Sequence, residues 1–314
     1  MDTKVKLKAG LYGSNGHQLT HLLREPHSLV DIHAVCEVTV PEDALMEPRA
    51  YPTLPALLED TEIDLVSLCS PRRADQVEDA LLCLRAGKHV LAEKPSAFSE
   101  ADLDLLLAEA EKTGREFREM GGTITTQPYW ALRKVVLSGE IGEVVQVFAQ
   151  KSYPYFLARP QDEGVDGGLF LQVGIHAARM IEHGTGQQLG ELSRIETGFG
   201  NPASGDLKMA SGFQGRLANG GLATAIANYL NPRGFGNWGN EALRVFGTKG
   251  MVEVTDGGNR SRLIVEDRDL GALPGEEEPM SYLSLYAHHL MGQGSMPLSL
   301  DEELHPLRTL LRGR

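Results

Sequence analysis

Apolar and polar positions follow two different patterns along the chain. Up to about residue 118, short apolar runs such as 63–69 and 90–92 alternate with segments in which apolar residues recur at helical spacing. One such segment, 74–85, places its aliphatic side chains on one face and is followed by Gly87, which ends the helix. Strands that alternate with helices form a parallel sheet with right-handed crossovers. We therefore predict an α/β domain over residues 1–118.

The pattern changes after about residue 120. A helical segment over 128–138 is followed by strand-like segments, some of them separated by turn signals such as Asn219-Gly220-Gly221. Consecutive strands joined by short turns favour an antiparallel sheet, so we predict a second domain over residues 119–314. Its expected strands are 144–152, 193–199, 208–216, 222–228, 243–246, 251–254 and 262–266.

The composition limits the classes of protein to which the chain can belong. Its 314 residues suffice for two domains, and 41% of them are hydrophobic. The formal net charge of −13 disfavours nucleic acids and anionic membranes as partners, because proteins that bind polyanions carry basic surfaces. No apolar stretch approaches the ~18 residues of a membrane-spanning helix, and the first residues lack the apolar core of a signal peptide.

The cysteines and histidines show no spacing typical of a metal site. The three cysteines, Cys36, Cys69 and Cys83, lie in apolar segments without a Cys-x-x-Cys pair. This pattern predicts reduced core residues in a cytoplasmic protein. The His288-His289 pair has no further ligand at metal spacing, so we predict no metal site.

A Glu-Lys-Pro run follows the last predicted strand of the first domain. Glu93 and Lys94 come directly after the apolar run 90–92, and Pro95 ends the strand. Ligands of parallel sheets bind outside the carboxyl ends of the strands, so Lys94 is placed for chemistry on a bound ligand. The alternative is an exposed ion pair at a strand end, which needs no function.

The first predicted turn has the location of a dinucleotide-binding loop. Gly13 keeps the first glycine of a Gly-x-Gly-x-x-Gly pattern, while Asn15 and Gln18 replace the second and third. Asn tolerates the left-handed conformation that such a loop needs. Glu37 follows the second predicted strand, where a carboxylate binds ribose hydroxyls and repels a 2′-phosphate. This favours NAD over NADP, although nearby Arg49 is an alternative partner for such a phosphate.

Several motifs recur in the order typical of one enzyme family. The segments 87–95 and 139–144, together with the turn at 10–18, resemble the Gfo/Idh/MocA oxidoreductases. The resemblance reaches to about residue 255. It implies a Rossmann domain followed by an α+β domain with a large, mostly antiparallel sheet, one face of which forms the substrate pocket. The other face often pairs subunits, which implies a homodimer or homotetramer.

The family's second signature, a Gly-Gly stretch followed by Asp-x-Gly-x-His, occurs with one change. Here it runs over 166–176, so His176 matches the family's catalytic histidine and Gln172 stands where the family usually has Asp. If residues 168–183 form a helix, both side chains share a face. A neutral amide can hydrogen-bond but cannot act as a base. Asp75 likewise stands where the family often has His.

The resemblance implies hydride transfer between a nicotinamide cofactor and a sugar, polyol or related hydroxy compound. Lys94 would then stabilise charge on the substrate oxygen, and His176 would take its proton. The resemblance and the loop chemistry together predict cofactor binding by Gly13, Ser14, Asn15, Gly16, His17, Gln18, Glu37, Ser70, Pro71, Glu93 and Lys94.

Polar and aromatic residues gather between the strand 144–152 and the Gly-Gly stretch. These are candidates to bind the hydroxyls or carboxylate of the substrate, and Asn228 to Pro232 and Trp238 are candidates for the pocket edge without assigned roles. Two alternatives remain: an NAD-using glycoside hydrolase or lyase of the same fold, and a non-catalytic nucleotide- or ligand-binding protein. The candidate substrate-binding residues are Lys151, Tyr153, Arg159, Asp166 and Gln172.

Overall fold

The computed structural model describes residues 6–156, 158–275 and 279–313, which divide into two compact units. The first unit contains the chain up to Gly121 together with Gly164–Asp166 and Tyr282–Pro297. The second unit contains Gly122–Glu163, Gly167–Ser281 and the chain from Leu298 onward. The sequence analysis had assigned residues 164–166 and 282–297 to the second domain. The acidic stretch 275–279, whose composition predicts a solvated loop, has its central residues 276–278 outside the described residues.

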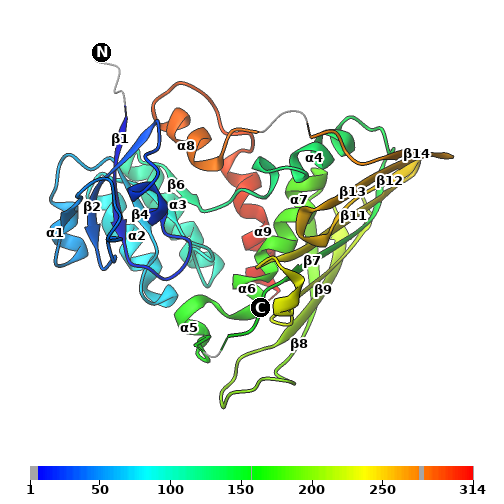
Figure 1. Cartoon of the computed structure of the whole chain (residues 1–314), viewed down its shortest axis with the longest axis horizontal. Coiled ribbons are helices and arrows are strands. Elements are labelled where there is room, and N and C mark those ends of the chain that lie inside the picture. Colours follow the sequence, from blue (N-terminus) through cyan, green and yellow to red (C-terminus); the bar gives the residue numbers. More distant parts are fainter. Residues whose placement is uncertain (1–5, 157, 276–278, 314) are drawn as a thin grey trace. The chain divides into compact units, whose positions relative to one another are not determined.

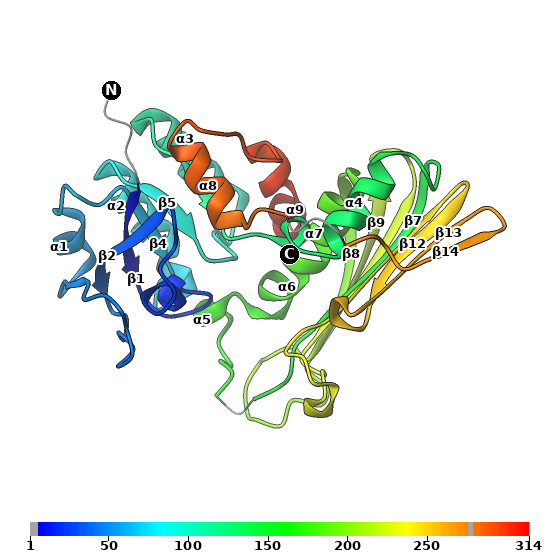
Figure 2. The ribbon, with the colours of Figure 1, turned by 45° about the horizontal axis from the view of Figure 1, so that its top comes forward.

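Six parallel strands form the sheet of the first unit, in the order β3-β2-β1-β4-β5-β6 (Figures 1 and 2). This is the order of dinucleotide-binding folds, in which the ligand lies where the strand order reverses, here at β1 and β4. The predicted parallel sheet is confirmed. The strands are β1 (Leu7–Tyr12), β2 (Val30–Cys36), β3 (Arg49–Ala50), β4 (Leu65–Leu68), β5 (His89–Ala92) and β6 (Phe117–Glu119).

Helices from both ends of the chain complete the first unit. Ser99 and Asp102 have the spacing of a helix cap, and the cap of α3 (Glu100–Thr113) is present, because the Ser99 hydroxyl accepts a hydrogen bond from the Asp102 N–H at 3.1 Å. The late helix α8 (Tyr282–Leu290) belongs to the core of this unit, where Tyr286 is fully buried. The remaining helical segments are η1 (Leu19–Leu23), α1 (Leu54–Leu58), η2 (Arg73–Asp75), α2 (Gln76–Arg85) and α5 (Glu163–Asp166), the last at the division between the units.

Eight strands form the sheet of the second unit, in the order β14-β13-β12-β11-β7-β10-β9-β8. The sheet is mostly antiparallel, as predicted, but its central pair β7 and β10 runs parallel. β7 and β10 have the bounds that the sequence predicted. The strands are β7 (Val144–Ser152), β8 (Leu189–Thr197), β9 (Ala210–Leu217), β10 (Leu222–Asn228), β11 (Asn240–Gly247), β12 (Gly250–Thr255), β13 (Arg260–Val265) and β14 (Arg268–Gly271).

The helices of the second unit lie on one face of its sheet (Figures 1 and 2). On the other face, the described strands expose Ile195, Leu222 and Phe246. Residues 168–183 do not form the single helix considered above, since they divide at Val173 into α6 and α7. The helical segments are η3 (Thr123–Thr125), α4 (Tyr129–Leu137), α6 (Gly168–Gln172), α7 (Gly174–Thr185), η4 (Arg233–Phe235), η5 (Asp256–Gly258) and α9 (Leu300–Arg312).

The cysteines and the helices agree with two expectations from the composition. Cys36, Cys69 and Cys83 are buried free thiols, and burial raises the pKa of all three. None of the helices in the described residues combines the length and the apolar character needed to cross a bilayer.

Candidate active site

The turn after β1 can form only with glycine at its first position. Gly13 has φ +71°, and a Cβ atom there would lie 2.1 Å from the carbonyl oxygen of Cys69. The Gly13 N–H donates to Cys36 at 3.0 Å, which joins the turn to the end of β2. The turn is thus packed tightly between the ends of β2 and β4, while Ser14, Gly16 and His17 are exposed.

Two amides replace the missing glycines and hold the turn in place. The Gln18 Nε2 donates to the carbonyls of Tyr12, Gly13 and Ser67, and its Oε1 accepts from the Leu19 N–H at 2.9 Å. Gln18 therefore supports the turn, which differs from the direct cofactor contact that we predicted for it. Asn15 ties the same turn to the carbonyls of Pro71 and Val165.

Glu93 is a buried carboxylate that reaches the same turn. Its Oε2 accepts from the His17 N–H at 2.6 Å and lies 3.0 Å from the His17 Nδ1. Its Oε1 accepts from the Lys94 N–H at 3.1 Å and lies 3.9 Å from the Lys94 Nζ. Burial alone would raise the pKa of Glu93, but the His17 hydrogen bond and the charges of Lys94 and Arg73 lower it to about 2. Glu93 is therefore ionised at neutral pH and positions both Lys94 and the turn.

Two further buried residues that the sequence analysis missed complete this polar network. Gln76 donates to the carbonyls of Glu93 and Pro95, which fixes the backbone on both sides of Lys94. Arg73 donates to Gln76 and to the carbonyl of Asn15. The predicted helix over 74–85 contained Gln76 and began one residue after Arg73, but only the tertiary contacts show what the two side chains bind.

The end of β2 fits the ribose of a dinucleotide. Glu37 has φ +54° and an exposed side chain, and its carbonyl accepts from the Ser14 hydroxyl at 2.9 Å. Ser70 and Pro71 follow β4 at the neighbouring strand end, where Ser70 donates to Asp79 at 2.7 Å. A glycine turn with an exposed tip next to an exposed carboxylate is the residue set that a dinucleotide requires. The structure thus brings the predicted cofactor residues together.

In the second unit, the break at Val173 separates the two signature residues onto different helices. Gln172 ends α6, whereas His176 lies in the first turn of α7. The His176 Nε2 lies 3.1 Å from the Tyr153 hydroxyl, and the Gln172 Oε1 accepts from the Tyr229 hydroxyl at 2.9 Å. Each signature residue is therefore oriented by a tyrosine.

The parallel pair β7 and β10 explains why these two tyrosines are neighbours. Ser152 and Asn228 are paired at the carboxyl ends of the two strands, so Tyr153 and Tyr229 leave the sheet at the same edge. Trp238 packs against Tyr153 and Phe156 with ring centroids 5.9 and 6.0 Å apart. The predicted edge residues thus join the predicted binding residues in one aromatic cluster: Tyr153, Tyr155, Phe156, Tyr229 and Trp238.

The remaining predicted binding residues have different surroundings. Lys151 forms an ion pair with Glu241, its partner across β7 and β11, and its Nζ lies 4.9 Å from the ring centroid of Tyr153. Arg159 is buried against the aromatic cluster. Asp166 is also buried, in the short segment that groups with the first unit.

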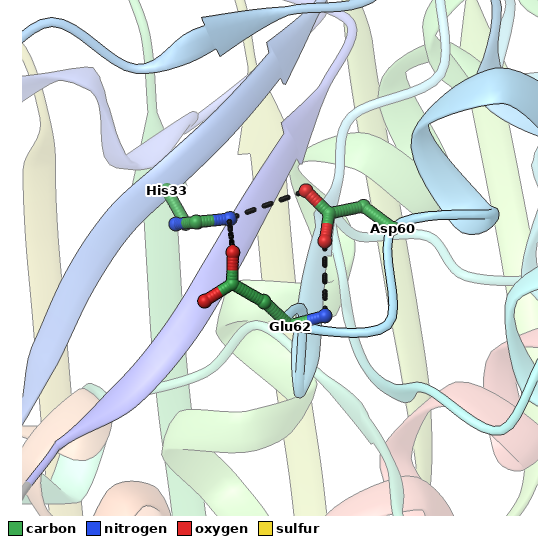
Figure 3. Close-up of side chains that lie close together, drawn as sticks. All are labelled: His33, Asp60 and Glu62. Atoms are coloured by element: carbon green, nitrogen blue, oxygen red, sulfur yellow. Dashed lines mark hydrogen bonds and ion pairs between the residues drawn. The ribbon is translucent and has the colours of Figure 1, made fainter.

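One group of side chains in the described residues has the spacing of a metal site. His33, Asp60 and Glu62 have ligand atoms within 4.8 Å of one another (Figure 3). Arg49 binds both carboxylates, at 3.0 Å to Asp60 and 2.9 Å to Glu62, and Lys8 also binds Glu62. The group is thus an ion-pair network in which cationic side chains already balance the acidic charges.

Comparison with known proteins connects this geometry to a family. The model described as "Oxidoreductase family, NAD-binding Rossmann fold" matches residues 8–119, and "GFO/IDH/MocA C-terminal domain" matches residues 129–253. Trans-1,2-dihydrobenzene-1,2-diol dehydrogenase of Sus scrofa is 29% identical over 260 residues, which cover 80% of this chain and 73% of that protein. Myo-inositol 2-dehydrogenase of Thermotoga maritima is 26% identical over 241 residues, covering 70% and 66%.

Solved structures show the same fold over nearly the whole chain. A Thermotoga maritima protein superposes with a TM-score of 0.84 at 24% identity, covering 98% of this chain and 96% of that one. An aldose-aldose oxidoreductase from Caulobacter crescentus, complexed with glycerol, has a TM-score of 0.80 at 19% identity and covers 98% and 97%. The two matching models and the fold show that the chain belongs to the Gfo/Idh/MocA family of NAD-binding oxidoreductases, as its motifs predicted.

Proposed function

We propose that the protein transfers a hydride between NAD and the carbinol carbon of a sugar, polyol or related hydroxy compound. Gly13 to His17 and Glu37 would hold the cofactor, which when bound accepts or donates the hydride. The relatives named above support a hydroxyl substrate. The observation that carries the assignment is that the Tyr153 hydroxyl lies 3.1 Å from the His176 Nε2, because this contact holds in place the ring that would take the proton.

In this mechanism His176 accepts the proton of the substrate hydroxyl and Lys94 stabilises the negative charge that develops on that oxygen. The Tyr153 hydroxyl keeps the imidazole oriented, and Glu93 keeps the Lys94 backbone in place. Gln172 has no acid or base function and orients substrate hydroxyls as a hydrogen-bonding group. In the reverse direction, the protonated His176 returns its proton to the alkoxide.

The test is steady-state formation of NADH with a panel of polyols, sugars and sugar acids. We expect His176→Ala and Lys94→Ala each to lower kcat by roughly 10²- to 10⁴-fold, the usual contribution of a positioned proton-transfer or charge-stabilising group. His176→Ala should keep the NAD affinity of the wild-type protein within ~3-fold, since His176 lies on α7 and outside the predicted cofactor-binding residues.

Two outcomes would favour the alternatives. Turnover of a glycoside without net NADH would indicate the NAD-using hydrolase or lyase, and NAD binding with no reaction on any substrate would indicate a binding protein. Wild-type activity in His176→Ala would overturn the assigned role of the histidine.

We propose NAD rather than NADP as the cofactor. The Glu37 carboxylate would repel a 2′-phosphate, and Arg49, the alternative partner for that phosphate, is bound to Asp60 and Glu62. Isothermal titration should show that NAD binds more tightly than NADP. The variant Glu37→Ser should lower the ratio of the NADP Kd to the NAD Kd by ~10-fold or more, because it removes a carboxylate that repels the 2′-phosphate. Equal affinities in the wild-type protein would contradict the proposal.

We also propose a homodimer or homotetramer through the open face of the eight-stranded sheet, in the cytoplasm. The exposed Ile195, Leu222 and Phe246 on that face and the buried free thiols support these assignments. Sedimentation of the wild-type protein and of Ile195→Asp tests the assembly: the variant should shift toward the monomer. A wild-type protein that sediments as a monomer would overturn it.

A further inference from the structure

Five backbone N–H groups of the turn after β1 and of the residue that begins η1 already donate within the protein. They are the N–H groups of Gly13, Asn15, Gly16, His17 and Leu19. η1 itself is a 3-10 helix of five residues, so its dipole is small. A pyrophosphate usually binds to free N–H groups at the start of a helix. At this turn it would therefore depend on positive charge from elsewhere in the protein.

A buried carboxylate lies directly under the tip of this turn. The Glu93 Oε2 accepts from the His17 N–H at 2.6 Å, and a Cβ atom on Gly16 would lie 2.7 Å from the same oxygen. Because the pKa of Glu93 is about 2, this carboxylate is ionised at neutral pH. The Lys94 Nζ, 3.9 Å from the Glu93 Oε1, balances its charge. The negative charges of a pyrophosphate would therefore meet no net attraction from this pair.

Arg73 is a second buried cation under the same turn. Only 3% of its surface is exposed, and its guanidinium donates to the Asn15 carbonyl of the turn. Burial lowers the pKa of Arg73, while the negative charge of Glu93 raises it. Asp166 and Glu119 act in the same direction as Glu93, with a weaker effect. Arginine stays protonated in proteins and a buried charge is screened little by salt, so Arg73 acts on a phosphate that it does not touch.

We propose that Arg73 is a positioning residue for the cofactor, whose buried charge supplies the attraction for the pyrophosphate that the pair of Glu93 and Lys94 lacks. The inference rests on the proposed cofactor and is independent of the substrate. The hydrogen bond to the Asn15 carbonyl places the guanidinium next to the exposed tip of the turn. The exposed Arg72, which precedes Arg73, is the alternative source of this charge, and the test includes it.

The test measures binding by isothermal titration of the full-length protein with NAD, ADP-ribose and adenosine, the last of which lacks a pyrophosphate. Arg73→Gln keeps a hydrogen-bond donor and removes the charge. It should raise the Kd of NAD and of ADP-ribose by roughly 10- to 100-fold and leave that of adenosine within ~3-fold, as expected for loss of a charge interaction with the pyrophosphate. The control Arg85→Met removes an exposed arginine that pairs with Glu109, and it should change none of these Kd values.

Two further variants separate the charge of Arg73 from its support of the turn. Arg73→Lys keeps the charge but loses the planar fork, so its Kd for NAD should stay within ~5-fold of the wild-type value. The double variant, Arg73→Gln with Glu93→Gln, removes both buried charges and leaves Lys94 as the cation, so its Kd for NAD should also return to within ~5-fold of the wild-type value. If Arg73 only supported the turn through its hydrogen bonds, the second change would restore nothing.

Several outcomes would overturn this role of Arg73. They are an unchanged NAD affinity in Arg73→Gln, a double variant that binds no better than Arg73→Gln, and a larger loss in Arg72→Met than in Arg73→Gln. Urea unfolding shows whether each variant is folded; if Arg73→Gln is not, a rise of more than ~5-fold in the NAD Kd of Arg73→Lys overturns the inference. A wild-type protein that binds neither NAD nor ADP-ribose would overturn the proposed function as well. NAD binding that depends on Arg73, without NADH formation, supports the inference and counts against the proposed reaction.

Discussion

The turn after β1 and the aromatic cluster of the second unit differ in how many of their buried polar atoms have hydrogen-bond partners. Around the turn, the side chains of Gln18, Glu93 and Gln76 form hydrogen bonds with backbone groups of the protein. The Arg73 Nε is the atom of that side chain that is buried without a hydrogen-bond partner. In the cluster, Arg159, Tyr155 and Asn231 each retain a buried atom without a partner. The difference indicates that the hydrogen bonding around the turn is nearly complete, whereas that of the cluster is not.

The sharpest test of the fixed turn is Gly13→Ala. A Cβ atom at that position would meet the Cys69 carbonyl oxygen at 2.1 Å in a left-handed backbone, so we expect a loss of more than about 3 kcal/mol in stability and loss of NAD binding. Urea unfolding and isothermal titration measure both effects.

The matched control is Gly114→Ala, which has φ +62° but no atom within 4 Å of the added Cβ. It should cost only the ~1–2 kcal/mol of backbone strain. Similar losses in the two variants would show that the close packing of the turn contributes nothing.

Glu93→Gln tests the buried carboxylate of the same region. We expect a loss of about 2–3 kcal/mol at pH 7, because charged hydrogen bonds to His17 and Lys94 are replaced by neutral ones. The pKa of Glu93 is lowered to about 2, so its contribution is present above the unfolded value near 4.5 and lost as pH falls toward 2. Urea unfolding at pH 7 and pH 3 should show a smaller pH effect in the variant than in the wild-type protein.

The exposed Glu78→Gln is the control for this change, and it should alter neither stability nor its pH dependence. If Glu93→Gln were as stable as the wild-type protein at pH 7, the buried carboxylate would not stabilise the turn, which would contradict the prediction.

The ion pair between Glu182 and His305 is a buried polar contact of the second unit in which both side chains have a partner. It tests whether incomplete hydrogen bonding is confined to the aromatic cluster or extends through the whole unit. The Glu182 Oε2 lies 2.7 Å from the His305 Nδ1, and this hydrogen bond raises the pKa of His305. Burial raises the pKa of Glu182. Both shifts mean that the folded state holds more protons, so stability is fully present below about pH 6.5 and falls as pH rises through the folded pKa of His305.

We expect the difference in free energy of unfolding between the wild-type protein and His305→Gln to fall by about 1 kcal/mol between pH 6 and pH 9. Burial lowers the pKa of His183 to about 3, so this neighbour takes up a proton on unfolding near pH 6 and there opposes the contribution of His305; because both proteins contain His183, the difference between them removes its effect. Chemical unfolding across this pH range measures the slope. If the slope of unfolding free energy against pH were the same in His305→Gln as in the wild-type protein, that slope would come from other titrating groups.

The smallest expected effect comes from Tyr155→Phe in the cluster. Its hydroxyl is buried without a partner, so removal should change stability by less than about 1 kcal/mol and in the stabilising direction. Tyr229→Phe is the matched change, since that hydroxyl donates to Gln172 at 2.9 Å, and it should cost about 1 kcal/mol. Thermal unfolding of both variants decides the point. If Tyr155→Phe lost more stability than Tyr229→Phe, the hydroxyl without a partner would contribute more than the paired one, which would contradict the prediction.

Local pattern predicted the elements well where the neighbours in sequence are also the neighbours in space. The bounds of β7 and β10 and the cap of α3 follow from alternation and from Ser99. The turn at 13–18 was located for the same reason, but the direction of the Gln18 side chain depends on the carbonyls of Gly13 and Ser67, which no sequence pattern shows.

The aromatic cluster was only partly predictable. Short turns between strands suggested antiparallel neighbours, so the parallel pairing of β7 with β10, which brings Tyr229 to Tyr153, could not be foreseen. The helix break at Val173 was missed because the segment contains no proline and its apolar spacing is continuous. Lys151 was predicted to bind substrate, yet its register partner on β11 is Glu241.

The burial of Tyr286 has a consequence for how the protein is made. This side chain, which the chain supplies late, packs with Leu7, Leu11 and Leu91, and its hydroxyl donates to the carbonyls of Val90 and Glu116. A ribosome that has produced only the first half of the chain has therefore not yet supplied part of the first core. Part of the apolar surface of the N-terminal region therefore stays uncovered until the segment that contains Tyr286 has been translated.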